Sequence, residues 1–225
     1  MNTIYLVRHG ENISNLTREF SCKHVDHPLT PRGILQAEQT AEFFKDRGID
    51  EVYASPMKRT RETAGIIAQA SGLTVNLTEH FREVNVGTLE FQPPTDENWD
   101  IHRRVVAEWY AGRHEVLFPE GENYLSLLHR MQEGLLQATR GKHGKNILIV
   151  GHAGIFSFTI KDICLNIDPM KLKNQGMRNC SITTIELDVI KQKPTGRLKD
   201  WAVHSHLSGE ATPAAWNKPP EIERK

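Results

Sequence analysis

The sequence predicts an α/β fold, in which helices cover a central sheet, and two observations lead to this prediction. Short apolar runs alternate along the chain with longer segments whose apolar residues recur every three or four positions. Two of the longer segments begin with a Thr-Pro or Ser-Pro pair, which is suited to the start of a helix. A chain of 225 residues fits one large domain better than two small ones.

Five short segments are predicted to be strands of the central sheet. Residues 4–7 and 147–150 are continuous apolar runs, which are typical of buried strands. Residues 51–54 and 74–77 are shorter candidates, and residues 181–187 form a longer segment that is rich in β-branched side chains.

The first two predicted helices follow the Thr-Pro and Ser-Pro pairs. Thr30 is suited to cap a helix whose apolar residues recur at steps of three or four, and Gly48 is suited to end it. Ser55 is expected to cap the next helix in the same way, rather than to act as a nucleophile. Two further amphipathic helices are predicted within residues 124–135 and 154–163.

The stretch of residues 92–121 differs from the rest of the chain, since it contains three prolines and one expected helix, around residues 99–110. We interpret it as a small helical insertion over one end of the sheet, and not as a separate domain. Residues 1–209 then form one domain that includes the insertion. Residues 210–225 are rich in proline, alanine and charge without periodicity, so a flexible tail is expected there.

The composition excludes several classes of partner. Lysine plus arginine equals aspartate plus glutamate, at 28 each, which argues against a dedicated nucleic-acid binder. The three cysteines are scattered and form no CxxC pair, as is typical of reduced thiols in the cytosol. No apolar run approaches the roughly 18 residues of a membrane span, and the chain begins in a strand without a secretory pattern. A cytoplasmic protein is expected, whose oligomeric state stays open, with a homodimer as one option.

Ionisable side chains follow four of the predicted strands. Arg8 and His9 come directly after the first strand, and Arg59 follows the second. Glu83 comes shortly after the third strand, and His152 follows the fourth. Because ligands of open α/β sheets bind at the carboxyl ends of the strands, these side chains are candidates for one common site.

The residue types in this set suit a phosphomonoester, which is a dianion. The planar guanidinium groups of Arg8 and Arg59 can each bind two phosphate oxygens. Arg59 is also expected in the first turns of the helix that Ser55 opens, where free N–H groups favour anions. Gly10 lacks a Cβ and would let the backbone approach the phosphate closely.

The same set also contains a nucleophile and an acid. Neutral His9 offers a nitrogen lone pair that can attack phosphorus, and Glu83 is suited to protonate the leaving alkoxide. His152, expected in its protonated form, would stabilise negative charge on the phosphoryl oxygens. This scheme needs no metal ion and no cofactor, and the remaining histidines show no HExxH or similar ligand spacing.

Some nearby residues allow two interpretations. His24 and His27 lie in the loop after the first strand, and solvated or structural roles are favoured over a contact with the substrate. Arg103 and Arg104 could bind a substrate carboxylate, but a solvated pair on an exposed helix face is favoured.

These motifs resemble those of the histidine phosphatase superfamily, also called phosphoglycerate mutase-like. The resemblance covers about nine-tenths of the chain and rests on these segments, in order: Leu6-Val7-Arg8-His9-Gly10-Glu11, Asn15, Leu29-Thr30-Pro31-Arg32-Gly33, Ser55-Pro56-Met57-Lys58-Arg59-Thr60, Glu83, Pro119-Glu120-Gly121-Glu122, Val150-Gly151-His152-Ala153-Gly154 and Asn179-Cys180-Ser181-Ile182.

The resemblance implies a three-layer α/β/α sandwich with a mostly parallel central sheet. It implies that His9 is phosphorylated during the reaction and that Glu83 is the proton donor. The phosphate pocket implied by the family consists of Arg8, Arg59, His152 and Asn15.

The chain also departs from the family pattern. Asn12 stands where Thr or Ser is usual, and Asn123 stands where Ser often follows Gly-Glu. After Gly87, where many members have a Trp-Glu-Gly-like run, this chain has Thr-Leu-Glu-Phe. The missing glycine and the following Pro93-Pro94 make the expected lid over the pocket unusual, which leaves the identity of the substrate open.

Three functions are compatible with the motifs. The first is a metal-independent phosphatase acting on a small phosphorylated metabolite through a phosphohistidine on His9. The second is a 2,3-bisphosphoglycerate-dependent phosphoglycerate mutase, and the third is a non-catalytic binder of phosphorylated ligands. Mutases of this family carry a long insertion between the acid and the second histidine, whereas Glu83 and His152 are only about 70 residues apart. A phosphatase is therefore expected, and the presence of both nucleophile and acid disfavours the binder.

Overall fold

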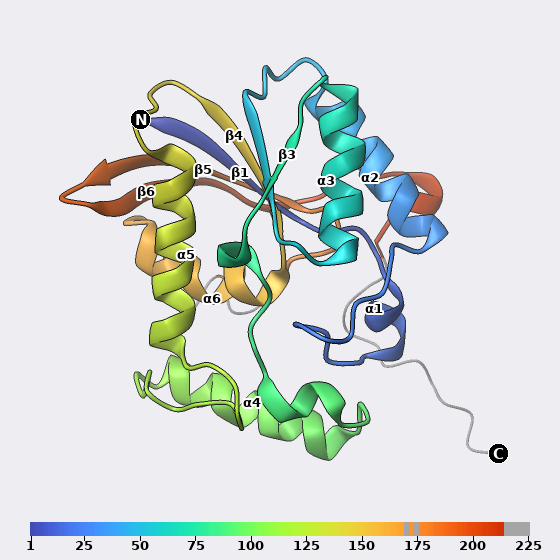
Figure 1. The fold of residues 1–225 in the computed structure, drawn as a ribbon, viewed down its shortest axis with the longest axis vertical. Helices are drawn as coiled ribbons and strands as arrows, with labels where there is room; N and C mark the ends of the chain where they lie inside the picture. The colour runs from blue at the N-terminus through green and yellow to red at the C-terminus, as the bar shows by residue number, and fades with distance from the viewer. Residues whose placement is uncertain (169–171, 173–175, 214–225) are drawn as a thin grey trace.

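The computed structural model of the chain describes residues 1–168, 172 and 176–213. These residues form a six-stranded sheet with helices on both faces, which confirms the predicted α/β sandwich (Figure 1). The sheet order is β3-β2-β4-β1-β5-β6, with parallel neighbours from β3 to β1 and antiparallel neighbours from β1 to β6. The strands are β1 (Asn2–Arg8), β2 (Glu51–Ala54), β3 (Val75–Leu77), β4 (Asn146–Gly151), β5 (Ile182–Ile190) and β6 (Lys193–Val203).

Each predicted helix is present in the described residues, and one short helix was not predicted. This helix, α1, has only five residues and therefore no periodic apolar face that the sequence could reveal. No helix within the described ranges has the length and apolar character needed to cross a membrane. The α-helices are α1 (Ile13–Thr17), α2 (Pro31–Phe44), α3 (Lys58–Ala70), α4 (Asp96–Tyr110), α5 (Tyr124–Thr139) and α6 (Ala153–Ile163).

The core lies in two layers, one on each face of the sheet. Val7 and Val150 pack in the layer under α2 and α3, whereas Ile4, Leu6 and Ile149 pack in the layer under α5 and α6. Successive strand residues point to opposite faces, so a strand that is covered on both sides is apolar at every position. This is why the central strands appear in the sequence as continuous apolar runs. Edge strand β6 is largely exposed or half-buried, and its polar sequence did not predict it.

The central pairing of β1 with β4 positions the functional residues. The two strands are parallel and in register from Thr3 opposite Asn146 to Arg8 opposite Gly151. Both strands therefore end at the same edge of the sheet. The residue that follows each of them is a histidine, His9 after β1 and His152 after β4.

The two predicted helix starts have different outcomes. The side chain of Thr30 accepts a hydrogen bond from the first turn of α2, as predicted, although α2 ends before Gly48. The prediction that Ser55 caps α3 is wrong, because α3 begins only at Lys58. The Oδ1 atom of Asp26 accepts the backbone N–H of Lys58 instead, at 2.8 Å. A loop residue far away in sequence thus satisfies the first amide of α3.

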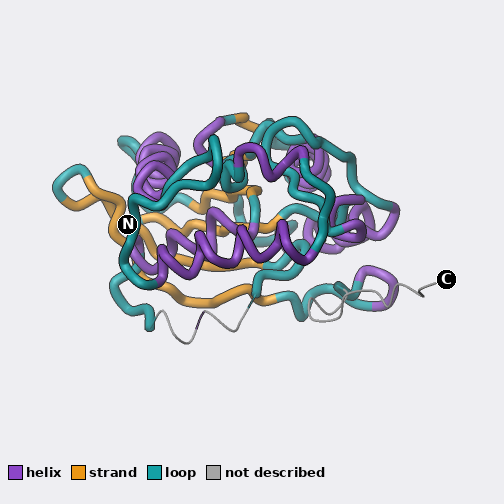
Figure 2. The backbone as a smooth tube through the Cα atoms, turned by 90° about the horizontal axis from the view of Figure 1, so that it is seen from below, coloured by secondary structure: helices purple, strands orange, loops and turns teal. Residues whose placement is uncertain are grey.

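The insertion lies beyond the carboxyl ends of the parallel strands. Its helix α4 runs across the lower part of Figure 1 and crosses in front of the strands in Figure 2. The ring of Trp109 packs edge-on against Phe118 and Tyr124, at centroid distances of 5.3 and 5.9 Å. The indole N–H of Trp99 donates to the carbonyl of Arg18 at 3.1 Å, so α4 is joined to the loop that follows α1.

The last described residues pack against α2. Gly209–Ala211 form a short 3-10 turn, in which Ala211 is 1% exposed and its carbonyl accepts a hydrogen bond from Gln36. The first residues of the tail predicted from residue 210 therefore contact the domain. The rest of that predicted tail, residues 214–225, lies outside the described residues, and the domain boundary stays a prediction.

The ring of His102 on α4 is expected to make the stability of the fold depend on pH. It packs against the rings of Phe20, Trp99 and Phe118, and burial lowers its pKa from 6.5 to about 4. The unfolded chain then binds a proton at His102 between pH 6.5 and 4 that the folded chain does not bind, so stability falls as the pH decreases through this window. From pH 7 to 5 the expected loss of unfolding free energy from this group is about 1–2 kcal/mol.

Urea unfolding at pH 7 and at pH 5, followed by circular dichroism, measures this loss. His102→Gln should reduce the difference between the two pH values by that amount, whatever its effect on absolute stability. The exposed His143 provides the matched control, since His143→Gln should leave the difference unchanged. An equal pH dependence in wild type and His102→Gln would show that His102 titrates normally in the folded chain.

Candidate active site

His9 and His152 face each other at the carboxyl ends of β1 and β4. Their ring centroids are 5.2 Å apart with an interplanar angle of 61°, and both residues are buried. The backbone N–H of His9 donates to the carbonyl of Gly151 at 3.0 Å, which extends the β1–β4 ladder into the site. The strand pairing alone therefore brings together two residues more than 140 positions apart in the sequence.

The hydrogen bond that His9 makes defines its reactive atom. Nδ1 lies 2.7 Å from the carbonyl oxygen of Gly10, and a carbonyl oxygen can only accept, so Nδ1 carries the hydrogen. Burial, followed by the nearby charges of Arg59 and Arg8, holds the pKa of His9 well below 6.5. The ring is therefore neutral at pH 7, and Nε2 keeps a lone pair.

The ring nitrogens of His152 have hydrogen-bonding roles opposite to those of His9. Nδ1 lies 3.0 Å from Nη2 of Arg59, which can only donate, so Nδ1 accepts. Nε2 lies 2.9 Å from the hydroxyl of Ser55. Burial, with the neighbouring charge of Arg59 next in size, holds the pKa of His152 well below 6.5. His152 is therefore neutral in the substrate-free protein, because desolvation disfavours the charged ring. Its protonation beside a bound phosphate stays a prediction.

Arg59 is fixed by a residue that the sequence did not single out. Its guanidinium donates to the hydroxyl and to the carbonyl of Ser21, both at 2.8 Å, in addition to His152. The segment that follows Ser21 is held in turn by Glu90, which is 5% exposed. Oε1 of Glu90 accepts the backbone N–H groups of residues 22–25 at distances from 2.7 to 3.1 Å.

Glu90 acts as an anionic anchor for this loop. Burial tends to raise the pKa of Glu90, but the four backbone hydrogen bonds outweigh it, so the pKa lies below its usual range. Glu90 occurs in the run after Gly87 where the chain departs from the family pattern. The sequence therefore showed that the run after Gly87 is unusual. It did not predict that Glu90 in this run binds the backbone of a loop more than 60 residues away.

Arg8 is the second buried cation of the site. It is 2% exposed, and its Nη1 donates to the carbonyl of Met177 at 2.7 Å. Burial lowers the pKa of Arg8 to about 10, against the attraction of Glu83, so the side chain stays charged at pH 7. Arg8 and Arg59 together provide the positive charge that a phosphate dianion requires.

The carboxylate of Glu83 lies at the N-terminus of α6, directly after His152. One oxygen accepts the N–H groups of Val84 and Ile155 at 2.9 and 3.0 Å, and the other accepts that of Gly154 at 3.1 Å. A Cβ on Gly154 would come within 2.5 Å of the carboxylate, so this glycine makes room for Glu83.

Arg130 of α5 holds the loop that carries Glu83. Its guanidinium donates to the carbonyls of His80, Arg82 and Glu83 at 2.6 to 3.0 Å. It also forms an ion pair with Glu122 at 2.7 Å, and Glu122 accepts the backbone N–H of the loop at residue 85. Glu83 is thus fixed both through its carboxylate and through its backbone.

Asn15 and Gly10 lie beside His9, and the side-chain oxygen of Asn15 and the backbone N–H of Gly10 both have partners. Oδ1 of Asn15 accepts from Nδ2 of Asn179 at 2.9 Å, and the same Nδ2 lies 3.1 Å from the carbonyl of His9. The backbone N–H of Gly10 donates to the hydroxyl of Thr63 at 3.0 Å. A Cβ on Gly10 would come within 2.5 Å of the carbonyl of Gly33, so packing on α2 requires the glycine. Phosphate binding by these two residues stays a prediction.

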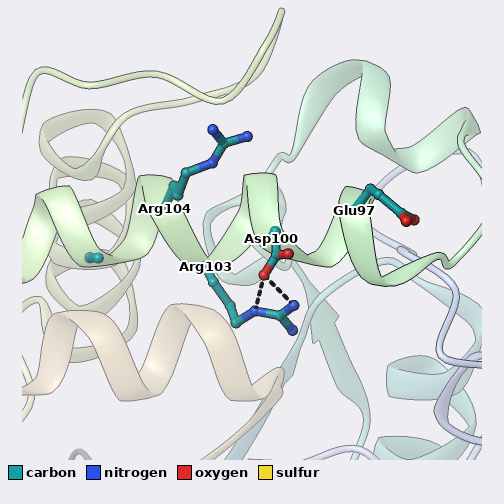
Figure 3. A pocket seen from close by; sticks show the side chains of 5 residues that line it. Glu97, Asp100, Arg103 and Arg104 are labelled. Carbon is teal, nitrogen blue, oxygen red and sulfur yellow. Dashed lines mark hydrogen bonds and ion pairs between the residues drawn. The ribbon is translucent and has the colours of Figure 1, made fainter.

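Arg103 and Arg104 lie on the exposed side of α4, as favoured from the sequence. They border an open surface pocket of about 640 Å³ together with Glu97, Asp100 and Ala107 (Figure 3). The guanidinium of Arg103 is paired with the carboxylate of Asp100. In the loop after α1, the ring of His27 contacts Glu19 and that of His24 contacts Phe91. The described part of the chain contains no group of three or more His, Cys, Asp or Glu side chains suited to a metal ion.

The sequence and the fold both have counterparts in known proteins. Residues 4–197 match the model of the histidine phosphatase superfamily (branch 1). The chain is 34% identical over 217 residues to "Probable phosphoglycerate mutase GpmB" of Escherichia fergusonii, a match that covers 94% of this chain and 97% of the relative.

Two solved structures have the same fold. The phosphoserine phosphatase of Entamoeba histolytica, in complex with 3-phosphoglyceric acid, matches with a TM-score of 0.72 at 25% identity, over 92% of this chain and 99% of that one. A mycobacterial glucosyl-3-phosphoglycerate phosphatase, in complex with inorganic phosphate, matches with a TM-score of 0.74 at 19% identity, over 92% and 100%. With the family model extending over nearly all of the described domain, this chain belongs to the histidine phosphatase superfamily.

Proposed function

We propose that this protein is a metal-independent phosphatase that hydrolyses a small phosphorylated metabolite through a phosphohistidine on His9. One observation carries the proposal. A buried neutral histidine has its Nδ1–H engaged by Gly10, so that Nε2 keeps its lone pair beside the two buried guanidinium groups of Arg8 and Arg59. A nucleophile beside a dianion-binding pocket is what phosphoryl transfer requires.

In the first step, Nε2 of His9 attacks phosphorus and the bond from phosphorus to the ester oxygen breaks. Arg8 and Arg59 neutralise the charge on the phosphoryl oxygens. The leaving alkoxide takes a proton from Glu83, which must first bind that proton on an oxygen now engaged with backbone N–H groups. The products of this step are the free alcohol and phosphohistidine.

In the second step, water attacks the phosphohistidine. Glu83, now a carboxylate, takes a proton from the water, and the bond between phosphorus and Nε2 breaks. Inorganic phosphate leaves, and His9 returns to its neutral state. Its Nδ1–H still donates a hydrogen bond to the carbonyl oxygen of Gly10. All groups in both steps are side chains of this chain and the attacking water.

Mutase activity is the second candidate, because the relative from Escherichia fergusonii is named as a phosphoglycerate mutase. One feature favours hydrolysis. The link between Glu83 and His152 is short and carries α4 as its added helix. The solved relatives described above are named as phosphatases of phosphoserine and of a glucosyl phosphoglycerate, which supports a small metabolite as substrate.

Replacing the nucleophile tests the proposal directly. His9→Ala should lower kcat for p-nitrophenyl phosphate by at least about 1,000-fold, because no other group can form the covalent intermediate. Intact-mass spectrometry after rapid acid-free quenching should find one phosphate on the wild-type chain and none on the variant. His143→Ala, at an exposed position, is the control. Substantial turnover by a folded His9→Ala protein would disprove the nucleophile assignment.

The role of Glu83 depends on the leaving group. Glu83→Gln should lower kcat/KM for alkyl phosphates by about 100-fold or more, since their alkoxides need a proton to leave. The loss should be much smaller for p-nitrophenyl phosphate, whose phenolate leaves without one. Equal losses on both substrates would contradict the assignment of Glu83 as the acid.

A panel of phosphorylated metabolites separates phosphatase from mutase. We expect phosphate release from at least one of phosphoserine, sugar phosphates and phosphoglycerates, with unchanged rates in excess EDTA. Phosphoglycerate interconversion that requires 2,3-bisphosphoglycerate and exceeds hydrolysis would favour the mutase instead. Loss of activity in EDTA would contradict metal independence.

A further inference from the structure

Ser55 contacts the site but has no part in the two chemical steps. It follows β2, is fully buried, and does not cap α3. Its hydroxyl lies 2.9 Å from Nε2 of His152, whereas its distance to the backbone N–H of Met57 is 3.5 Å, at the limit of a hydrogen bond. The contact with His152 is therefore the principal interaction of this side chain near the site.

The chemistry of the two partners of His152 determines its tautomer. Arg59 has only donors, so Nδ1 must accept, and a neutral ring with a bare Nδ1 carries its hydrogen on Nε2. The Nε2–H then donates to the oxygen of Ser55. His9 is the opposite tautomer, with the hydrogen on Nδ1.

The position of Nδ1 gives this tautomer a function. Nδ1 contacts Arg59, so it lies on the side of the ring where the phosphoryl group is proposed to bind. When phosphate oxygens replace Nδ1 as acceptors for Arg59, Nδ1 can accept a hydrogen bond from a protonated phosphoryl oxygen, which the monoanion of a phosphomonoester and inorganic phosphate both carry. Ser55 can accept from Nε2–H both before and after this exchange.

We propose that Ser55 is a positioning residue, which holds His152 by Nε2 so that Nδ1 faces the phosphoryl group. The proposal rests on the proposed function, since it assumes that phosphate binds between Arg59 and His9. Without the hydroxyl, the buried Nε2–H loses its acceptor, and the ring can turn or shift its hydrogen to Nδ1. A hydrogen on Nδ1 would point at the donor of Arg59 in the substrate-free site.

The kinetic test compares Ser55→Ala and Ser55→Thr with Ser181→Ala. Thr keeps the hydroxyl, and Ser181 is equally buried with a hydroxyl that has no partner among the described residues. We expect Ser55→Ala to lower kcat for p-nitrophenyl phosphate about 10- to 100-fold, because small misplacements of catalytic groups have effects of that size. Ser55→Thr should recover most of this loss, and Ser181→Ala should stay near wild type.

A spectroscopic test separates positioning from packing. Long-range proton–nitrogen correlation spectra of protein labelled in histidine report the tautomer of each ring, and His152→Gln assigns the signal. Wild type, Ser55→Thr and Ser181→Ala should show His152 with its hydrogen on Nε2, and Ser55→Ala should not. On titration with inorganic phosphate, the Nδ1 signal of His152 should shift in the first three proteins and shift less in Ser55→Ala.

The two tests also separate this proposal from the proposed function. If the wild type hydrolyses no phosphomonoester, the proposed function fails, and the tautomer of His152 still decides the role of Ser55. A hydrogen on Nδ1 of His152 in the wild-type protein would overturn the proposal without any variant. Equal kcat and equal His152 signals in wild type and Ser55→Ala would overturn it as well.

Discussion

The parallel pairing of β1 with β4 is the constraint on which the rest of the site depends. Its register sets Arg8 opposite Gly151, so both strands end together and each is followed by a histidine. Shifting the pairing by one residue would turn every strand side chain to the other face, where a different helical layer covers it. The two apolar cores therefore hold the register, and through it the distance between His9 and His152.

Burial and two neighbouring cations then determine the protonation state of the histidines. Arg8 and Arg59 lie in a desolvated pocket, where their charges are stabilised by carbonyl and hydroxyl oxygens such as those of Ser21. Burial, together with the proximity of these charges, keeps His9 and His152 neutral. The pocket is thus positive without protonated histidines, which combines attraction for a phosphate dianion with a nucleophile that retains its lone pair.

Much of the fold could be predicted from the sequence because its signals are local. Four strands of the sheet, the principal helices and the inserted α4 each have an apolar pattern that matches their own burial, whereas the short edge strand β3 was predicted although Leu77 is exposed. The elements that were missed lack such a pattern, since α1 is too short and β6 is a polar edge strand. The start of α3 was placed too early because Asp26, a distant loop residue, accepts the first amide of that helix.

By itself, the sequence determined the family and the set of residues at the strand ends, because each of these follows an apolar run and carries a distinctive side chain. Tertiary structure alone decided their protonation and their partners. The neutral state of His152, its bond to Ser55 and the anchoring of a loop by Glu90 all depend on groups 60 to 100 residues apart. Desolvation and hydrogen-bond geometry exist only once the chain has folded, so no local pattern encodes them.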